Sequence, residues 1–532
     1  MTGAKKVLVG DELSPRGVEI LRAAGLDVRV QTGLKGAALR EALAGVQALV
    51  VRSATKVTPD VLDGVDALRV IGRAGIGVDN VDVAAASRRG VVVMNTPGGN
   101  AVTAAEHAIA LLCALARRIP QATASVKAGK WEKARFKGVE LCDKTLGVIG
   151  LGNIGRIVAD RARGLRMRVI AHDAFLSAEA AGKLGVTLVP LDELLARSDF
   201  VTLHVPLTAE TRGMFGAAQL AKLKPGAMLI NAARGGIVDE AALLEALQSG
   251  RLAGAALDVF ATEPPGASPL LALEQVICTP HLGASTDEAQ ERVSVEIAEQ
   301  VVAFLERGEV RNGVNVAALP VDGSEPLRPF VGLASRLGAM LGQLAEGGIE
   351  AVEVEVLGTS LEPAVKAIGA AALAALLRTH VEGPVNEVNA ALLAGERGIR
   401  FGVAHRTAAG ECVSGVGIVA CGTGWSRRIR GTMVPEGEGL QPALTSLDEF
   451  ALQVRLGEHH LLLRNEDKPG VIGAVGTAFG KHGINVSELR VALSSDRREA
   501  LQLWNIERAP GPAVLEEIRR LPHVRSATAL SL

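Results

Sequence analysis

The sequence predicts an α/β protein built from several domains. At 532 residues the chain is too long to fold around one hydrophobic core. Its first third alternates short valine-rich strands with amphipathic helices, which is the pattern typical of parallel sheets. A further apolar strand, which begins near residue 146, then ends in a glycine-rich turn, residues 150–155, that opens a helix.

The glycine-rich turn has the G-x-G-x-x-G spacing, in which each glycine has a separate steric task. Gly150 allows a tight turn, Gly152 lets a pyrophosphate approach the backbone, and Gly155 lets the helix pack closely on the strand. A second strand ends at Asp173, whose carboxylate can accept hydrogen bonds from an adenosine ribose and repel a 2′-phosphate. The pattern therefore predicts a Rossmann-type domain that binds NAD in preference to NADP.

The position of this turn, near residue 150, implies that a separate α/β unit precedes it. A long helix over residues 101–116 joins the two units, and a helix over residues 286–307 is long enough to return the chain to the first. We therefore expect an NAD-binding domain, residues 99–290, inserted in a discontinuous substrate domain with a flavodoxin-like sheet. The two parts of that substrate domain are residues 1–98 and 291–318.

Composition changes near Leu319, and the stretch Pro320–Pro326 is typical of a linker. Residues 319–456 contain one clear alternating strand, residues 350–356, and several helices rich in alanine and leucine, so an α+β domain is expected. Residues 457–532 read as a ferredoxin-like βαββαβ module, small enough to bind a ligand or to form a dimer contact.

Overall composition excludes several classes of protein. The formal net charge of −1 gives no field that would attract nucleic acid or an anionic membrane. No uninterrupted apolar run is long enough to span a bilayer, and the N-terminus enters a strand directly, unlike a signal peptide. The five cysteines have no C-x-x-C spacing, so we expect reduced thiols, no metal site and a cytoplasmic location: Cys113, Cys142, Cys278, Cys412 and Cys421.

Three reactive side chains follow successive strands beside the expected NAD site. NAD accepts a hydride, so the protein must hold an alcohol carbon and remove the hydroxyl proton. His281 ends an apolar strand and has a suitable chemistry for that proton transfer, and Glu263, after the preceding strand, could reach it. Arg234, at another strand end, could hold a substrate carboxylate. Each alone is a common surface residue, but together they indicate a dehydrogenase.

Several longer stretches carry a specific resemblance. GLGNIG, NAARGGIVDE, ALDVFATEPP and PHLGAST together resemble the D-2-hydroxyacid dehydrogenase family. VVRSATKVT, GRAGIGVDNVD, VMNTPGGN and ARRIPQATASVKAGKW resemble the branch of that family that oxidises D-3-phosphoglycerate at the start of serine synthesis. The resemblance covers residues 5–316 almost without gaps. The tail from Leu319 resembles the long form of the branch, which carries an intervening regulatory domain and a C-terminal ACT domain.

The resemblance implies NAD-dependent oxidation of D-3-phosphoglycerate. Because Arg234 would bind the carboxylate of any 2-oxo acid, reduction of 2-oxoglutarate is expected as a side activity. The resemblance also implies catalytic roles for Arg234, Glu263 and His281. The residues expected to contact NAD are Gly150, Gly152, Asn153, Ile154, Gly155, Asp173, Ala232, Ala233, Asp258, Gly283 and Ala284. Ile76 departs from the family, in which relatives often carry threonine, so a hydroxyl contact with the cofactor is lost.

The phosphate of the substrate requires further cations. Arg52 and Arg73 each follow a strand of the first domain, and Asn100 lies where the chain crosses to the second. All three could therefore converge on a cleft between the two domains. The basic segment Lys127–Lys137 is either a solvated face or, as the resemblance suggests, a contact with the active site of a neighbouring subunit. The second reading requires a homo-oligomer, and we expect a homotetramer.

The turn Asn465–Gly470 resembles the ligand-binding turn of ACT domains. Asn465 and Asp467, with Asn485 from a partner subunit, could bind an amino-acid effector, and the pathway makes L-serine the expected one. Alternatively, the module serves only for dimerisation. Two other functions stay open: a dehydrogenase of an unphosphorylated 2-hydroxy acid, and an NAD-sensing scaffold without turnover.

Overall fold

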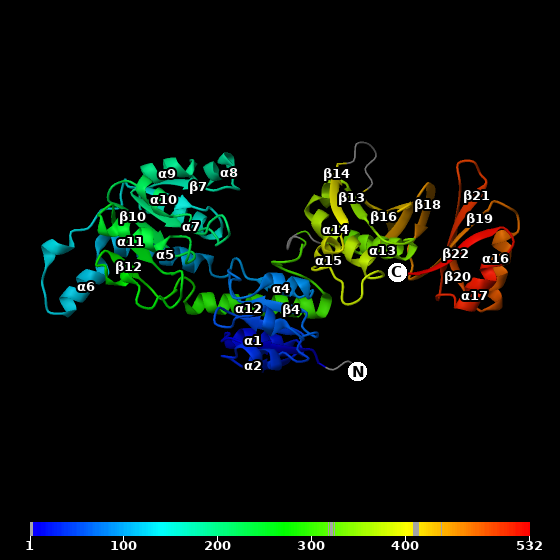
Figure 1. Ribbon diagram of the computed structural model, residues 1–532, viewed down its shortest axis with the longest axis horizontal. Helices are drawn as coiled ribbons and strands as arrows, with labels where there is room; N and C mark the ends of the chain where they lie inside the picture. Colours follow the sequence, from blue (N-terminus) through cyan, green and yellow to red (C-terminus); the bar gives the residue numbers. More distant parts are fainter. Residues whose placement is uncertain (1–3, 318, 320–322, 324, 408–413, 438) are drawn as a thin grey trace.

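The computed structural model describes residues 4–317, 319, 323, 325–407, 414–437 and 439–532. The molecule is elongated (Figure 1), with the N-terminal unit between the dinucleotide-binding sheet on one side and two further units on the other. Cys412 and several residues of the expected linker Pro320–Pro326 lie outside the described residues.

The first unit is a five-stranded parallel sheet in the order β2-β1-β3-β4-β5. This is the flavodoxin-like order that the sequence predicts. Its elements are β1 (Lys6–Val9), α1 (Pro15–Ala23), β2 (Asp27–Val30), α2 (Gly36–Ala42), β3 (Ala48–Val51), α3 (Pro59–Leu62), β4 (Val70–Arg73), α4 (Val83–Arg88) and β5 (Val92–Asn95). Strands β1, β3, β4 and β5 are almost wholly apolar because helices cover both faces of the sheet.

Helix α12 (Asp287–Arg307) returns to this sheet from far along the chain. Ile297 and Val301 on α12 share a buried core with Val7 and Val9 on β1. The Thr286 hydroxyl caps the start of α12 by accepting from the Ala289 N–H. The first unit is therefore discontinuous in sequence.

The second unit is a seven-stranded parallel sheet in the order β12-β11-β10-β9-β6-β7-β8. Strand order reverses between β6 and β9, which is the switch point where such sheets bind dinucleotides. The Rossmann-type prediction is confirmed. Its elements are α5 (Ala101–Arg117), α6 (Ile119–Lys127), η1 (Lys133–Phe136), β6 (Thr145–Ile149), α7 (Asn153–Gly164), β7 (Arg168–His172), α8 (Ala178–Lys183), β8 (Thr187–Leu188), α9 (Leu191–Arg197), β9 (Phe200–Leu203), α10 (Ala217–Lys222), β10 (Ala227–Asn231), α11 (Glu240–Gln248), β11 (Leu252–Leu257), η2 (Pro269–Ala272) and β12 (Val276–Cys278).

The third unit is a six-stranded mixed sheet in the order β14-β13-β15-β16-β17-β18, with α13 and α14 packed on one face. Its elements are α13 (Arg328–Leu344), β13 (Ala351–Leu357), η3 (Thr359–Ala364), α14 (Val365–Leu377), α15 (Ala390–Glu396), β14 (Arg400–Arg406), β15 (Gly415–Gly422), β16 (Trp425–Glu436), β17 (Gly439–Leu447) and β18 (Phe450–Arg455). The sequence pattern identified only β13. The other strands carry glycines and outward-facing arginines, which weaken an alternating apolar pattern.

One stretch of the described chain, Thr359–Leu377, is long and apolar enough to cross a membrane by length and composition. It comprises η3 and α14 and is 67% buried inside the protein. Leu373 and Leu377 on α14 pack in one core with Leu337 and Leu341 on α13. The apolar character of this stretch is accounted for by the core of the third unit.

The fourth unit has the expected βαββαβ order, with its sheet arranged as β20-β21-β19-β22. Its elements are β19 (His459–Glu466), α16 (Val471–Lys481), β20 (Val486–Leu493), β21 (Glu499–Ile506), α17 (Pro512–Arg519) and β22 (Val524–Ser531). Leu462, Leu501 and Leu503 face away from its helices and belong to the core of the third unit. The third and fourth units therefore share a continuous apolar interface.

Candidate active site

The glycine turn has the shape that a pyrophosphate needs. Gly150 has a φ of 90°, and a side chain there would meet the His204 carbonyl oxygen at 2.6 Å. A Cβ on Gly155 would lie 1.9 Å from the Gly150 carbonyl oxygen, so this glycine allows helix α7 to pack on the strand. A Cβ on Gly152 would meet nothing within 4 Å, which leaves the approach to the N-terminus of α7 open. The three steric tasks fit a bound dinucleotide.

Asp173 lies beside this turn, directly after β7. Its carboxylate accepts hydrogen bonds from the backbone N–H groups of Leu151, at 2.7 Å, and Phe175, at 2.8 Å. Burial alone would raise the pKa of Asp173, but these hydrogen bonds outweigh it and hold the pKa below its usual range. An ionised carboxylate therefore lies beside the glycine turn.

His281 and Glu263 form a hydrogen-bonded pair at the carboxyl edge of the same sheet. The Nδ1 atom of His281 lies 2.8 Å from Oε2 of Glu263. The other oxygen of Glu263 accepts from the Phe260 N–H at 3.1 Å, which orients the carboxylate. Because a carboxylate only accepts, Nδ1 carries a proton and Nε2 is left as the atom that can take one. His281 has a φ of 56°, a rare conformation for histidine and one that clusters at functional sites.

The segment that carries His281 is attached to Asp258, which directly follows β11 and is 1% exposed. The Asp258 carboxylate accepts from the N–H groups of Leu282, at 2.7 Å, and Gly283, at 2.9 Å. Ala284 follows directly and is half-buried. The segment from Thr279 to Gly283, called the His281 strap below, is thus fixed to the end of the neighbouring strand.

Arg234 reaches across the cleft to the first unit. It follows β10, where the Asn231 side chain shapes the turn by donating to the Arg234 carbonyl and accepting from the Ala233 N–H. The guanidinium donates through Nε to Asp79 of the first unit at 2.9 Å. A Cβ on Gly77 would lie 1.8 Å from Nη2 of Arg234, so only glycine leaves room for this approach.

Asp79 was not among the residues that the sequence singled out, because no local pattern separates it from other loop carboxylates. Its loop is held to β5 by Asn95, whose side-chain N–H donates to the Ile76 carbonyl at 2.5 Å. Only the folded cleft brings Asp79 to Arg234.

Arg73 and Asn100 carry buried polar atoms that have no partner among the described residues: Nε of Arg73 and Oδ1 of Asn100. The hydroxyl of Thr96, which is fully buried, is a third such atom that sequence reasoning missed. Buried polar groups are usually paired, so three unsatisfied atoms near the crossover between the units are consistent with a ligand site. Burial and the charge of Arg234 lower the pKa of Arg73 to about 10, while Asp79 opposes that shift.

Arg52 is placed differently. Its backbone N–H donates to Asp11 at 2.7 Å, and its guanidinium lies 3.4 Å from the Glu12 carbonyl oxygen. Its charge lowers the pKa of Arg73, which places the two guanidinium groups in one electrostatic neighbourhood. The structure therefore brings Arg52, Arg73 and Arg234 close enough for their charges to interact.

The expected effector residues occupy different environments in the fourth unit. Asp467 is exposed in the turn after β19, and Asn485 is exposed at the start of β20. Asn465 is 2% exposed, and its side-chain oxygen accepts from Gln502 at 2.9 Å inside the sheet. No hydrogen bond within the described chain joins these three side chains.

The basic segment Lys127–Lys137 lies on an arm at the outer edge of the second unit, formed by α6 and η1 (Figure 1). Apolar side chains on this arm are unusually exposed: Ile119 at 50%, Val126 at 54% and Trp131 at 85%. Exposed apolar groups gathered on a projecting arm are typical of a protein interface.

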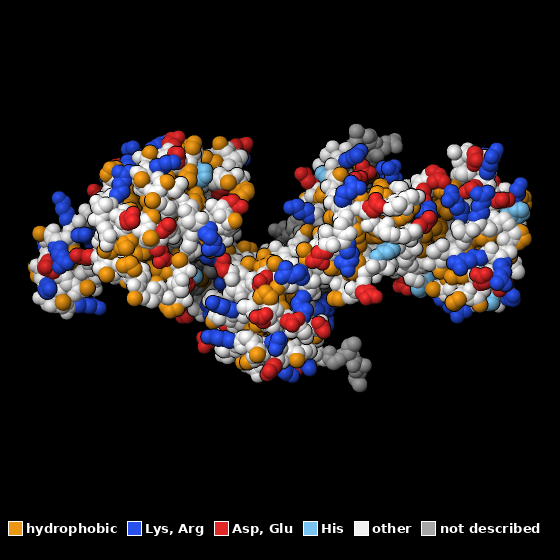
Figure 2. Space-filling view, in the orientation of Figure 1, with side chains coloured by type: hydrophobic (Ala, Val, Ile, Leu, Met, Phe, Trp, Pro, Cys, Tyr) orange, Lys and Arg blue, Asp and Glu red, His pale blue; other side chains and the backbone are white. Residues whose placement is uncertain are grey.

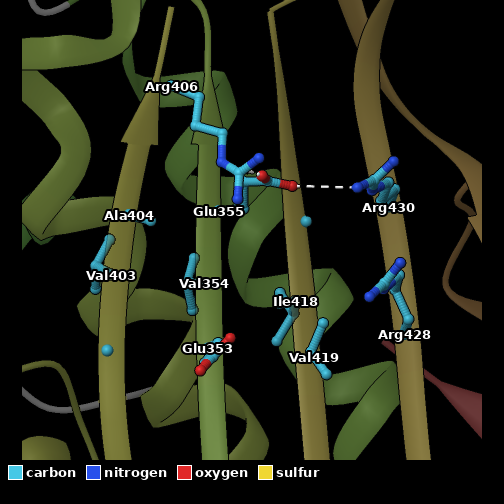
Figure 3. A pocket seen from close by; sticks show the side chains of 12 residues that line it. Glu353, Val354, Glu355, Val403, Ala404, Arg406, Ile418, Val419, Arg428 and Arg430 are labelled. Atoms are coloured by element: carbon cyan, nitrogen blue, oxygen red, sulfur yellow. Dashed lines mark hydrogen bonds and ion pairs between the residues drawn. The ribbon is translucent and has the colours of Figure 1, made fainter.

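A separate charged hollow of about 490 Å³ lies on the face of the third unit's sheet that α13 and α14 leave open. Figure 3 shows Glu355 between Arg406 and Arg430, with the nearest atoms 2.8 and 3.2 Å apart. Glu353 and Arg428 lie on the same strands as Glu355 and Arg430, two residues away from each, and form no ion pair within the described residues. This hollow is remote in sequence from the cleft residues.

Figure 2 shows positive and negative side chains interspersed over the visible face of all four units. Among the described residues, no group of three or more histidine, cysteine, aspartate or glutamate side chains could hold a metal ion.

Family models match three consecutive parts of the chain. The NAD-binding domain of D-isomer specific 2-hydroxyacid dehydrogenases matches residues 109–283, the D-3-phosphoglycerate dehydrogenase intervening domain matches residues 326–440, and the ACT domain matches residues 459–523. With the sheet order and the glycine turn, these matches define an NAD-dependent 2-hydroxyacid dehydrogenase.

Full-length relatives narrow this class. A D-3-phosphoglycerate dehydrogenase of Synechocystis is 42% identical over 99% of this chain and 95% of its own length. The Archaeoglobus fulgidus enzyme of the same name is 42% identical over 99% of this chain and 100% of its own length. The human one is 41% identical over 92% of this chain and 93% of its own length. The chain belongs to the D-3-phosphoglycerate dehydrogenase family.

Solved structures resemble the first two units. A glyoxylate reductase from Paecilomyes thermophila has a TM-score of 0.55 and 30% identity, covering 59% of this chain and 99% of that one. A D-lactate dehydrogenase from Aquifex aeolicus, complexed with NAD and lactic acid, has a TM-score of 0.52 and 28% identity, covering 58% of this chain and 99% of that one.

Proposed function

We propose that this protein oxidises D-3-phosphoglycerate to 3-phosphohydroxypyruvate with NAD, as the first step of L-serine synthesis. The single observation that carries this proposal is the His281–Glu263 pair, 2.8 Å apart, at the carboxyl edge of the sheet in which Arg234 also follows a strand. The names of the full-length relatives support the same substrate.

In this proposal His281 takes the hydroxyl proton of the substrate through Nε2, and Glu263 holds the ring and stabilises the imidazolium that forms. Arg234 binds the substrate carboxylate, which must share the guanidinium with Asp79. NAD, when bound, supplies the hydride acceptor.

Arg52, Arg73 and Asn100 bind the phosphate end of the substrate. The unsatisfied Nε of Arg73 supports this assignment because it can donate to a phosphate oxygen of the ligand. A 2-oxo acid carries the same carboxylate, so reduction of 2-oxoglutarate is expected as a side activity.

The open Gly152 and the ionised Asp173 support cofactor contacts along one edge of the sheet. The proposed contact residues are Gly150, Gly152, Asn153, Ile154, Gly155, Asp173, Ala232, Ala233, Asp258, Gly283 and Ala284.

The proposed domain limits are 1–98 and 291–318 for the substrate domain, 99–290 for the NAD-binding domain, 319–456 for the intervening domain and 457–532 for the ACT domain. The arm with exposed Trp131 supports a homo-oligomer, for which we propose a tetramer. The free thiols of Cys113, Cys142, Cys278 and Cys421 support a cytoplasmic location.

Steady-state turnover of the full-length protein tests the proposal. We expect NAD reduction with D-3-phosphoglycerate and little with D-glycerate. Equal turnover of D-glycerate would favour a dehydrogenase of unphosphorylated acids. No turnover with any 2-hydroxy acid, despite NAD binding, would favour an NAD-sensing scaffold.

Replacing Asp173 by alanine should weaken NAD binding and reduce the ratio of the affinity for NAD to the affinity for NADP. The carboxylate both accepts ribose hydrogen bonds and repels a 2′-phosphate, and Ala174 and Phe175, which follow it, supply no cation. Titration of each cofactor against protein fluorescence measures both affinities, with Glu179→Ala on exposed α8 as the control. A wild-type protein that uses NADP as readily as NAD would show that Asp173 does not face the ribose.

L-serine should inhibit the enzyme through the ACT domain. Coupling between distant sites is typically about 1–3 kcal/mol, which changes apparent affinity by about 5–150-fold. Because serine is small, its ammonium and carboxylate must supply most of the binding, and the exposed Asp467 and Asn485 are suited to bind them. Inhibition can also act on kcat, by hindering closure of the cleft.

Asp467→Ala and Asn485→Ala should each abolish this inhibition while leaving uninhibited turnover unchanged. Glu516→Ala, on the exposed side of α17, is the matched control. Point variants are preferable to deletion of residues 457–532, because deletion would uncover Leu462, Leu501 and Leu503. Wild-type turnover that ignores millimolar L-serine would mean that the domain is structural or binds another ligand.

A further inference from the structure

A histidine on the crossover helix contacts the carboxylate to which the His281 strap is fixed. His107 lies on α5, and its Nε2 atom is 3.2 Å from Oδ1 of Asp258 and 3.1 Å from the Thr279 hydroxyl oxygen. Thr279 in turn donates to Asp258 at 2.6 Å. The imidazole is largely buried, with 19% of its side chain exposed.

The position of the proton on His107 follows from its neighbours. Burial alone would raise the pKa of Asp258, but hydrogen bonds from His107, Thr279 and Leu282 outweigh it, so the pKa lies below its usual range and the group only accepts. The single hydroxyl proton of Thr279 points to Asp258, so the hydroxyl oxygen can only accept from His107. Both neighbours of Nε2 are therefore acceptors, and Nε2 must carry a proton.

The two carboxylate oxygens of Asp258 accept different numbers of hydrogen bonds. Within the described residues, Oδ1 accepts hydrogen bonds from His107, Thr279 and the Leu282 N–H, whereas Oδ2 accepts one, from the Gly283 N–H. The His281 backbone N–H also binds the Asp258 carbonyl oxygen at 2.9 Å. Thr279, Leu282 and Gly283 all belong to the His281 strap. Among the hydrogen bonds of the described residues, His107 is thus the donor to this carboxylate that lies on another element, α5.

We propose that His107 is a positioning residue for the dehydrogenase reaction. By holding Oδ1, it sets the orientation in which Oδ2 of Asp258 and the Gly283 backbone face the cofactor, and it keeps His281 in its left-handed conformation beside Glu263. It also ties the strap to α5, the helix that starts directly after Asn100 at the crossover between the two units. This inference rests on the proposed function, which places NAD at Asp258 and proton transfer at His281.

The test compares His107→Leu with His107→Gln. Glutamine can present an N–H near the position of Nε2, whereas leucine cannot donate at all. We expect His107→Leu to weaken NAD binding and lower kcat/KM for D-3-phosphoglycerate, each by about 10–100-fold, the loss expected for hydrogen bonds to a charged group. His107→Gln should recover most of both. Glu106→Gln, an exposed neighbour on the same helix, is the control and should match wild type.

NAD titration and turnover are measured separately, so the two proposals can fail independently. Wild-type protein that binds NAD but does not oxidise D-3-phosphoglycerate would refute the proposed function, while the NAD affinities would still test His107. Wild-type affinity and turnover in His107→Leu would overturn the positioning role, as would a glutamine variant no better than leucine.

If His107→Leu does not fold, Thr279→Val can be used instead, because it removes the other side-chain hydrogen bond to Oδ1 of Asp258. In the double variant with His107→Ala, which also cannot donate, the losses in NAD affinity should be non-additive because both residues act on Asp258. Additive losses would contradict the shared role.

Discussion

Replacing His281 by alanine is expected to lower kcat by about 10²–10⁴-fold, which is the usual contribution of general acid–base catalysis. The fold should tolerate the change, because the ring is half exposed and the strap is held by backbone hydrogen bonds to Asp258. Steady-state rates with D-3-phosphoglycerate and NAD measure the effect. A loss smaller than about tenfold would show that another group removes the proton.

Glu263→Gln probes the same pair in a different way. The carboxylate, 2.8 Å from Nδ1, stabilises the protonated ring. Removing its charge favours the neutral ring, which is the form that accepts a proton during oxidation. The acidic limb of the pH–rate profile should therefore move to lower pH. Glu288→Gln, exposed at the start of α12, is the control, and an unshifted limb in Glu263→Gln would refute the pairing.

The second large effect concerns selection for the phosphate group. D-glycerate should have a kcat/KM at least about 10²-fold below that of D-3-phosphoglycerate, because it leaves the buried Arg73 guanidinium unpaired. Arg73→Ala should raise KM for D-3-phosphoglycerate more than for 2-oxoglutarate, and Arg52→Ala should act in the same direction. Arg29→Ala, an exposed position on β2, is the matched control.

Comparable kcat/KM values for D-glycerate and D-3-phosphoglycerate would contradict this assignment. An equal rise in KM for both anionic substrates in Arg73→Ala would show that Arg73 acts through general electrostatic attraction, without a specific phosphate contact.

Short-range chemistry explains why much of the fold could be predicted. Gly150 has a positive φ, and a Cβ on Gly155 would meet the Gly150 carbonyl oxygen five residues away, so these local requirements let the motif alone indicate the turn and the helix that follows it. Buried parallel strands such as β3 and β10 are continuous apolar runs, which also makes them visible in sequence. The strands of the third unit were mostly missed because Gly417, Arg428 and Arg430 face an open sheet surface and break that pattern.

The effector site illustrates the limit of motif reading. Asn465 shares its turn motif with Asp467, yet Asn465 still lies within β19, where its side chain accepts from Gln502, whereas Asp467 lies beyond the end of the strand and is exposed. Their separate environments follow from the register of β19 with β21, which pairs residues far apart in the chain.

The sequence by itself determined the parallel-sheet architecture, the dinucleotide turn and the reactive residue types at the strand ends, because these depend on local sterics and hydrophobic periodicity. Only the tertiary structure decided which side chains meet. The contacts of Arg234 with Asp79 and of His107 with Asp258 join residues 155 and 151 positions apart. Such pairs depend on how helices and sheets pack across the cleft, and the relative placement of distant elements leaves no periodic signal in the chain.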